Sequence, residues 1–191
     1  MKNKGLNRRQ VLHRTGVLGL AATSVLARDV FAAVFLEIEQ AQKQLLPQAD
    51  TFVPVSVVLD DAKLAAIAKQ TDTRVPGHFA PRVWQGVMAG KGLGWVVADQ
   101  VIGKFDVIDF AVGFAADGTV VGMEILAYRE SHGAEVRQAG WRKQFVGRKG
   151  PQHMRFADDI RNISGATLSC QHVTEGVQRA SSLVGLLGAG G

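Results

Sequence analysis

The segment from Asp106 to Ala127 constrains the fold of this chain most strongly. Apolar residues occupy alternate positions in its first half, at Ile108, Phe110, Val112 and Phe114. A period of two is typical of a strand with one buried face. Asp117 and Gly118 then give a hairpin turn signal, and the apolar run 120–127 predicts the returning strand. The chain is therefore expected to contain an antiparallel sheet.

Shorter patterns place further elements before this hairpin. We expect strands at 53–59, 82–88 and 94–102, and a loop at 76–81. A short helix is expected at 62–70, behind the acidic pair Asp60 and Asp61. A helical lead-in lies within 33–53 and ends near Pro47, with one face formed by Ile38, Ala41 and Leu45 and another by Leu36, Gln40 and Gln44.

Two helices are expected after the hairpin. Residues 134–147 are interpreted as one helix, with Val136, Ala139 and Phe145 inward and Arg137, Arg142 and Lys143 outward. Over 167–187 the apolar positions recur in steps of four and three, at Val173, Val177, Ala180, Val184 and Leu187. That stripe is typical of a helix packed on a core. The fold class predicted is α+β, an antiparallel sheet with packed helices.

The charge of the chain is concentrated at its beginning. With 191 residues, of which 47% are apolar, the chain can build one domain around one core. The formal net charge is +5, and residues 1–27 account for all of it through five basic side chains and no acid. Because phosphate backbones are bound by clustered Lys and Arg, we expect no nucleic acid as a partner of the neutral remainder.

Residues 1–27 have the organisation of a signal peptide. A basic stretch from Lys2 to Arg9 precedes about a dozen apolar residues, too few to span a bilayer as a helix. Arg8 and Arg9 resemble the pair of a twin-arginine export signal. Cleavage is expected after Ala27, with a second option after Ala32, and an uncleaved anchor is the alternative.

Cys170 is the only cysteine of the chain. One cysteine excludes an internal disulfide, a Cys-x-x-Cys redox pair, and Cys-rich iron–sulfur or zinc sites. His78, His153 and His172 lie too far apart in sequence to indicate a metal site. We expect Cys170, Trp95 and Trp141 to serve as core residues. Electron transfer by this chain would therefore need an organic cofactor.

The segment Ser164-Gly165-Ala166-Thr167-Leu168-Ser169 lies where a loop enters the final helix. One interpretation is a helix cap, in which Ser or Thr accepts a hydrogen bond from a backbone N–H and Gly165 provides the turn. The other is an anion site. The first N–H groups of a helix have no partner within it, and they point at whatever anion is held there. The sequence pattern alone leaves both interpretations open.

Residues 163–169 resemble the flavinylation motif of the FMN-binding domain found in the NqrC and RnfG subunits of sodium-pumping and Rnf respiratory complexes, and in small exported relatives. In that family a flavin transferase uses FAD to bond the last Thr of the motif to the phosphate of FMN. The resemblance implies that Thr167 carries the cofactor. It also implies that FMN contacts the neighbouring residues Ser164, Gly165, Ala166, Leu168 and Ser169.

A second segment supports the resemblance. Residues 128–133, Tyr-Arg-Glu-Ser-His-Gly, followed by Trp141 and by Gln-Phe at 144–145, look like the family's His-x-Glu-Thr-Pro-Gly segment and its downstream pattern. The resemblance covers about 80–185 and implies a fold of the NqrC/RnfG type, with an FMN-binding domain at 81–187 behind a lead-in at 33–80. It adds four residues to the expected FMN site: Glu130, Ser131, His132 and Gly133.

The chain departs from the family at Arg161, where many flavinylated members have Asp three residues before the Ser. The resemblance otherwise implies an electron carrier on the periplasmic face of the inner membrane, with a membrane-bound redox protein as partner and no catalytic residue of its own. The alternative is a flavin-free exported binding module in which residues 164–169 only cap a helix. A hydrolase is disfavoured because no Gly-x-Ser-x-Gly or Ser-x-x-Lys motif is present.

Overall fold

The computed structural model describes residues 33–129 and 132–188, so the predicted signal peptide, Glu130 and Ser131 lie outside the described residues. One antiparallel sheet has the strand order β1-β6-β5-β4-β3-β2. Its strands are β1 (Ala33–Val34), β2 (Thr51–Val55), β3 (Arg82–Met88), β4 (Lys91–Ile102), β5 (Val107–Ala115) and β6 (Val120–Tyr128). Five strands form the body of the sheet, and the two-residue β1 lies at its edge. The predicted α+β class is confirmed.

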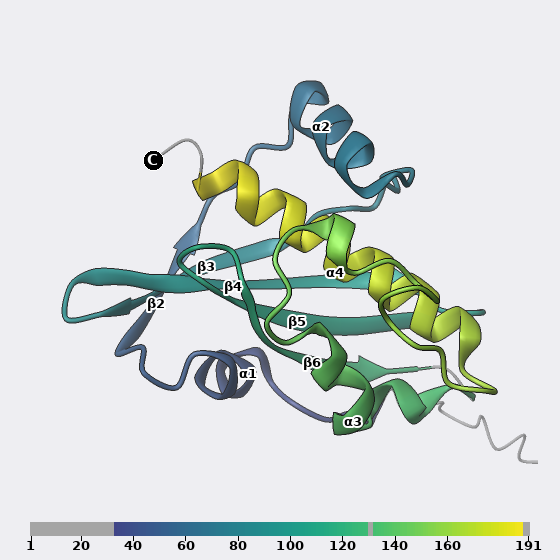
Figure 1. Ribbon diagram of the computed structural model, residues 1–191. Coiled ribbons are helices and arrows are strands. Elements are labelled where there is room, and N and C mark those ends of the chain that lie inside the picture. Colours follow the sequence, from purple (N-terminus) through teal and green to yellow (C-terminus); the bar gives the residue numbers. More distant parts are fainter. Residues whose placement is uncertain (1–32, 130–131, 189–191) are drawn as a thin grey trace, which may run out of the picture.

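Helices cover both faces of this sheet (Figure 1). The 22-residue α4 (Thr167–Gly188) crosses one face, and α1 (Ile38–Leu45) packs on the other. Helix α2 (Asp61–Thr71) lies against α4, where the hydroxyl of Ser182 donates to the side-chain oxygen of Gln70 over 2.8 Å. Of the helices that the structure describes, none is long and apolar enough to cross a membrane.

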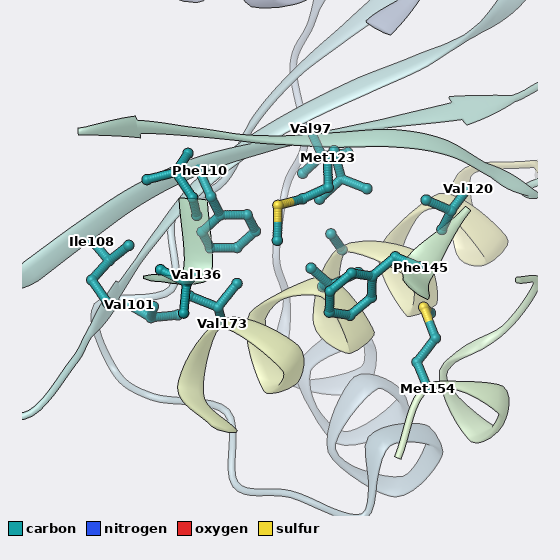
Figure 2. Close-up of a cluster of buried hydrophobic side chains, with 14 of the residues drawn as sticks. Val97, Val101, Ile108, Phe110, Val120, Met123, Val136, Phe145, Met154 and Val173 are labelled. Atoms are coloured by element: carbon teal, nitrogen blue, oxygen red, sulfur yellow. The ribbon is translucent and has the colours of Figure 1, made fainter. Parts of the chain in front are cut away.

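The larger core lies between α4 and the sheet. All four alternating residues of β5 are fully buried there, as the period of two predicts: Ile108, Phe110, Val112 and Phe114. The α4 stripe is buried from Val173 to Val184, while Leu187 in the last turn is half-buried. Figure 2 shows Val173 of the helix beside Val101, Ile108 and Val136. Burying a side chain of this size contributes about 1.5–3 kcal/mol, so this interface holds α4 against the sheet.

A smaller core lies under α1. Ala41 and Leu45 are buried against strand residues Val96, Ala98, Ala111 and Leu126. Gln40 and Gln44 are exposed on the opposite side of the helix, as its pattern predicts. The sheet is therefore covered on both faces.

Two sequence-based boundaries were wrong. The strand expected at 53–59 is β2 at Thr51–Val55, an edge strand that tolerates Pro54 because no outer neighbour needs its missing N–H. The helix expected at 134–147 is broken into η1 (Ala134–Arg137), α3 (Ala139–Arg142) and η2 (Lys143–Phe145), followed by η3 (Pro151–His153). Gln138 interrupts it with extended backbone angles, φ −61° and ψ 127°.

The break also changes which side chains are buried. Val136 and Phe145 enter the core as expected, but Ala139 is exposed. Arg142 is half-buried rather than outward, because it pairs with the carboxylate of Glu124 and donates to the carbonyl of Met123 over 2.7 Å.

Candidate functional site

The candidate site lies at the start of α4. Residues 164–165 form a turn in which Gly165 has φ +88°, a left-handed conformation that favours glycine. The helix begins at Thr167, so Ala166 precedes it and offers no side-chain acceptor for a cap. The N–H of Cys170 donates to the carbonyl of Ala166 over 2.8 Å and closes the first turn. The amides ahead of it have no carbonyl partner within an α-helix, which is the arrangement that binds anions.

The hydroxyl of Thr167 is accessible and held by a neighbouring amide. The residue is exposed, and its Oγ1 accepts a hydrogen bond of 2.9 Å from Nδ2 of Asn162. Because an amide N–H is only a donor, this bond orients the Thr167 oxygen without removing its proton. The Thr167 oxygen is therefore accessible to a group that approaches from solvent.

The two segments that resemble the family lie together in the structure. The hydroxyls of Tyr128 and Ser169 are 3.0 Å apart, and Tyr128 also donates to the carbonyl of His132. Since a phenol has one proton, Ser169 must be the donor in the bond between the two hydroxyls. Gly133, with φ +87°, passes so close that a Cβ there would lie 2.7 Å from each of the two oxygens. The loop after β6 is thus joined directly to the first turn of α4.

The Trp-and-Gln segment positions the chain before the motif. Arg161 donates its backbone N–H to Oε1 of Gln144 over 2.8 Å, and Nε1 of Trp141 donates to the Arg161 carbonyl over 2.8 Å. Trp141 is buried and meets Phe145 edge-on, with ring centroids 5.3 Å apart. The Arg161 side chain is exposed. The departure from the family at this position therefore changes an exposed side chain outside the lining of the Thr167 cavity, while the Arg161 backbone is held by Trp141 and Gln144.

A cavity of about 430 Å³ opens beside Thr167, within the ~300–1,000 Å³ range of ligand sites. It is lined by Lys104, Phe105, His132 and the motif residues Gly165, Ala166, Thr167, Leu168 and Ser169. Five of the six predicted motif residues therefore line one cavity together with His132. Ser164 is exposed outside this lining, and the side chains of Ala166 and Ser169 are buried.

Lys104 and Phe105 were not predicted as site residues from the sequence. They belong to the turn between β4 and β5, about sixty residues before the motif, and no local pattern indicates which helix end that turn faces. Asn162 and Tyr128, whose side chains contact Thr167 and Ser169, were also not predicted to hold the motif.

The remaining candidates for chemistry lie outside this cavity or are buried. Within 33–129 and 132–188, no group of three His, Cys, Asp or Glu side chains is arranged to hold a metal ion. Cys170 is buried, which raises the pKa of its thiol and makes it an unreactive core residue, as predicted. A hollow of about 480 Å³ on the α1 face, beside the ion pair between Arg129 and Asp109, contains none of the predicted site residues.

Comparison with known proteins identifies the domain that holds this site. Residues 103–182 match the FMN-binding domain family. The chain carries an FMN-binding domain. It is also distantly homologous to the RnfG subunit of the Na⁺-translocating ferredoxin:NAD⁺ oxidoreductase complex of Acetobacterium woodii, with 24% identity over 147 residues, 72% of this chain and 69% of its relative. The predicted family is confirmed, and the family implies FMN as cofactor.

The residues of the FMN-binding domain fit that cofactor. Its phosphate needs an anion site, and the first turn of α4, which begins at Thr167, directs its backbone N–H groups at an anion held there. Its ring system needs a slot with apolar walls, and the cavity is bounded by Phe105 and Leu168, which are 77% and 41% exposed. Both features lie at the cavity that Thr167 lines.

Proposed function

We propose that this chain is an electron-transfer flavoprotein that holds FMN through a phosphoester to Thr167. The observation that carries the proposal is the position of that hydroxyl, exposed at the first residue of α4 inside a cavity of the FMN-binding domain. In the attachment step, Oγ1 of Thr167 attacks the phosphorus on the FMN side of FAD. The pyrophosphate bond breaks, AMP leaves with its electron pair, and the hydroxyl proton is lost to solvent. A flavin transferase catalyses this maturation.

The chain's own residues assist by placement and charge. The Asn162 amide orients Oγ1 of Thr167. The remaining negative charge of the phosphate is stabilised by the α4 amides and the positive end of the helix dipole, an effect of about 0.3–1 kcal/mol at an exposed helix end. Arg161 presents a cation to the transferase where many flavinylated members present a carboxylate.

When bound, FMN supplies the one- and two-electron chemistry, and the protein supplies anchoring, orientation and tuning. The described residues need not act as acid, base or nucleophile during electron transfer. The relative from A. woodii is a subunit of a ferredoxin:NAD⁺ oxidoreductase complex. By analogy, we propose that this chain exchanges electrons with a membrane-bound redox protein.

We further propose that residues 1–27 direct export and that the mature chain works on the periplasmic face of the inner membrane. Residues 33–80 then serve as a lead-in to the FMN-binding domain at 81–187. The basic, acid-free leader supports export, and the neutral charge of the remainder is consistent with a role that involves no nucleic acid.

The proposal is tested by producing the chain together with a flavin transferase and recording its visible absorption. We expect a flavin spectrum that bleaches under a chemical reductant and returns on exposure to air. A colourless protein from the same co-expression would contradict the proposal and support a flavin-free binding module.

A further inference from the structure

We propose that the turn between β4 and β5, residues 103–106, forms the second wall of the flavin site, with Phe105 against the isoalloxazine ring and Lys104 as a charge that tunes it. This inference rests on the proposed attachment of FMN at Thr167. It assigns a function to two residues outside both segments that resemble the family's motifs.

Phe105 is the most exposed aromatic or large aliphatic side chain of the described residues, at 77%. A single exposed apolar side chain is common on a protein surface, whereas exposed apolar side chains that lie together mark a binding site. Phe105 lies at the cavity that starts at Thr167, together with the partly exposed Leu168. A flat aromatic ring entering this cavity meets an apolar surface from the turn and another from the helix, which is the geometry of a stacking site.

Lys104 gives this wall a positive charge. Its Nζ lies 4.8 Å from the centroid of the Phe105 ring, a cation–π distance, so the ammonium group is held beside the same cavity. A flavin gains electrons on reduction, and a nearby cation stabilises the added negative charge. Lys104 therefore favours the reduced cofactor and raises its reduction potential.

The turn is anchored to the helix that carries Thr167. Nδ1 of His172 lies 2.6 Å from the carbonyl of Ile102 and 3.0 Å from that of Gly103, so the ring nitrogen donates to the end of β4. The N–H of Gly103 donates to the carbonyl of Asp106 over 2.8 Å and closes the turn. His172 lies in α4, five residues after Thr167, so it fixes the distance between the turn and the attachment point.

The experiment compares flavin-loaded wild type with Phe105→Ala, Phe105→Trp and Lys104→Gln, measuring flavin fluorescence and reduction potential. Loading is first established by the mass of each denatured protein. Phe105→Ala is expected to increase flavin fluorescence because an aromatic stacking partner quenches it, and Phe105→Trp is expected to restore the quenching. Lys104→Gln is expected to disfavour the reduced form about tenfold, which lowers the potential by about 30 mV for a two-electron couple.

Matched controls flank the β3–β4 turn, at the opposite end of β4. Met88→Ala and Lys91→Gln change an exposed apolar residue and a lysine at the β3–β4 turn, about 40 Å away along the 12 residues of β4. Both are expected to retain the wild-type fluorescence and potential. Loaded Phe105→Ala and Lys104→Gln proteins that match wild type in both readouts would overturn this inference and leave the proposed function standing. A wild-type chain that never loads flavin would overturn both.

Discussion

Tyr128 and Ser169 place their hydroxyl oxygens 3.0 Å apart, although 41 residues separate them in the sequence. Tyr128 ends β6 and Ser169 lies in the first turn of α4, so this contact joins the loop after the sheet to the helix start that carries Thr167. Both side chains are buried, so the bond satisfies polar groups that water does not reach. The contact makes one site from two distant segments.

Gly133 and Gly165 provide a matched pair that tests this contact. Both have a positive φ, +87° and +88°, so Ala at either position costs about 1–2 kcal/mol in backbone strain. A Cβ at Gly133 also meets the oxygens of Tyr128 and Ser169 at 2.7 Å, whereas a Cβ at Gly165 meets nothing within 4 Å. Urea unfolding should therefore show a larger loss of stability for Gly133→Ala than for Gly165→Ala. Equal losses would contradict the close approach.

Asn162→Ala should slow flavin attachment without preventing it. The variant removes the hydrogen bond to Oγ1 of Thr167, worth about 1 kcal/mol, which corresponds to a rate about fivefold lower if the bond is retained in the attachment step. The measurement is the time course of flavin incorporation by a transferase using FAD. Asn162 is exposed, so the folded state should retain its stability. An unchanged rate would show that Asn162 does not position the hydroxyl.

Arg161→Asp restores the carboxylate that many flavinylated members have, and we expect faster flavin incorporation. Only the exposed side chain changes, because Gln144 and Trp141 hold the Arg161 backbone. The free energy of unfolding should stay within about 0.5 kcal/mol of wild type. Arg161→Asn is the control, since it removes the cation without adding a carboxylate. Equal incorporation in all three proteins would mean that this position does not affect recognition.

Asp99 should make stability fall as pH rises. Burial raises its pKa from the ordinary 3.8 to about 6, with Arg179 and His78 as cationic neighbours and Asp109 as an anionic one. Between these values Asp99 binds more protons in the folded chain than in the unfolded chain, so the contribution of this group to stability is greatest below about pH 4 and is lost as pH rises to about 6. The loss from this one group is on the order of 3 kcal/mol.

The Asp99→Asn variant isolates that contribution. Unfolding free energies of wild type and variant, measured from pH 4 to pH 7, should differ by an amount that changes with pH in this window. A constant difference across the window would contradict the raised pKa of Asp99.

The parts of the fold that sequence predicts are those with a strong period. The alternation in β5 and the stripe of α4 each specify one buried face, and both faces are buried as expected. The helix expected at 134–147 failed because Gln138 adopts an extended conformation that lets Val136 and Phe145 reach the core from separate short helices. A periodic pattern carries no information about such a break.

The candidate site also has residues that the sequence predicts and residues that only the tertiary structure shows. Thr167 and Gly165 lie in a contiguous motif, so the sequence contains what is needed to find them. Phe105 reaches the cavity only through tertiary structure, by a turn that His172 holds across 70 residues of sequence. The exposed position of Phe105 at this cavity is known only from the pairing of the strands and the placement of α4.

The most direct test of the account is the intact mass of the denatured chain after co-expression with a flavin transferase. Wild type and Thr167→Ser should each gain the mass of FMN less one water, because both keep a hydroxyl at this position. Thr167→Val should gain nothing. An unmodified wild type, or an adduct that persists in Thr167→Val, would contradict attachment of FMN at Thr167.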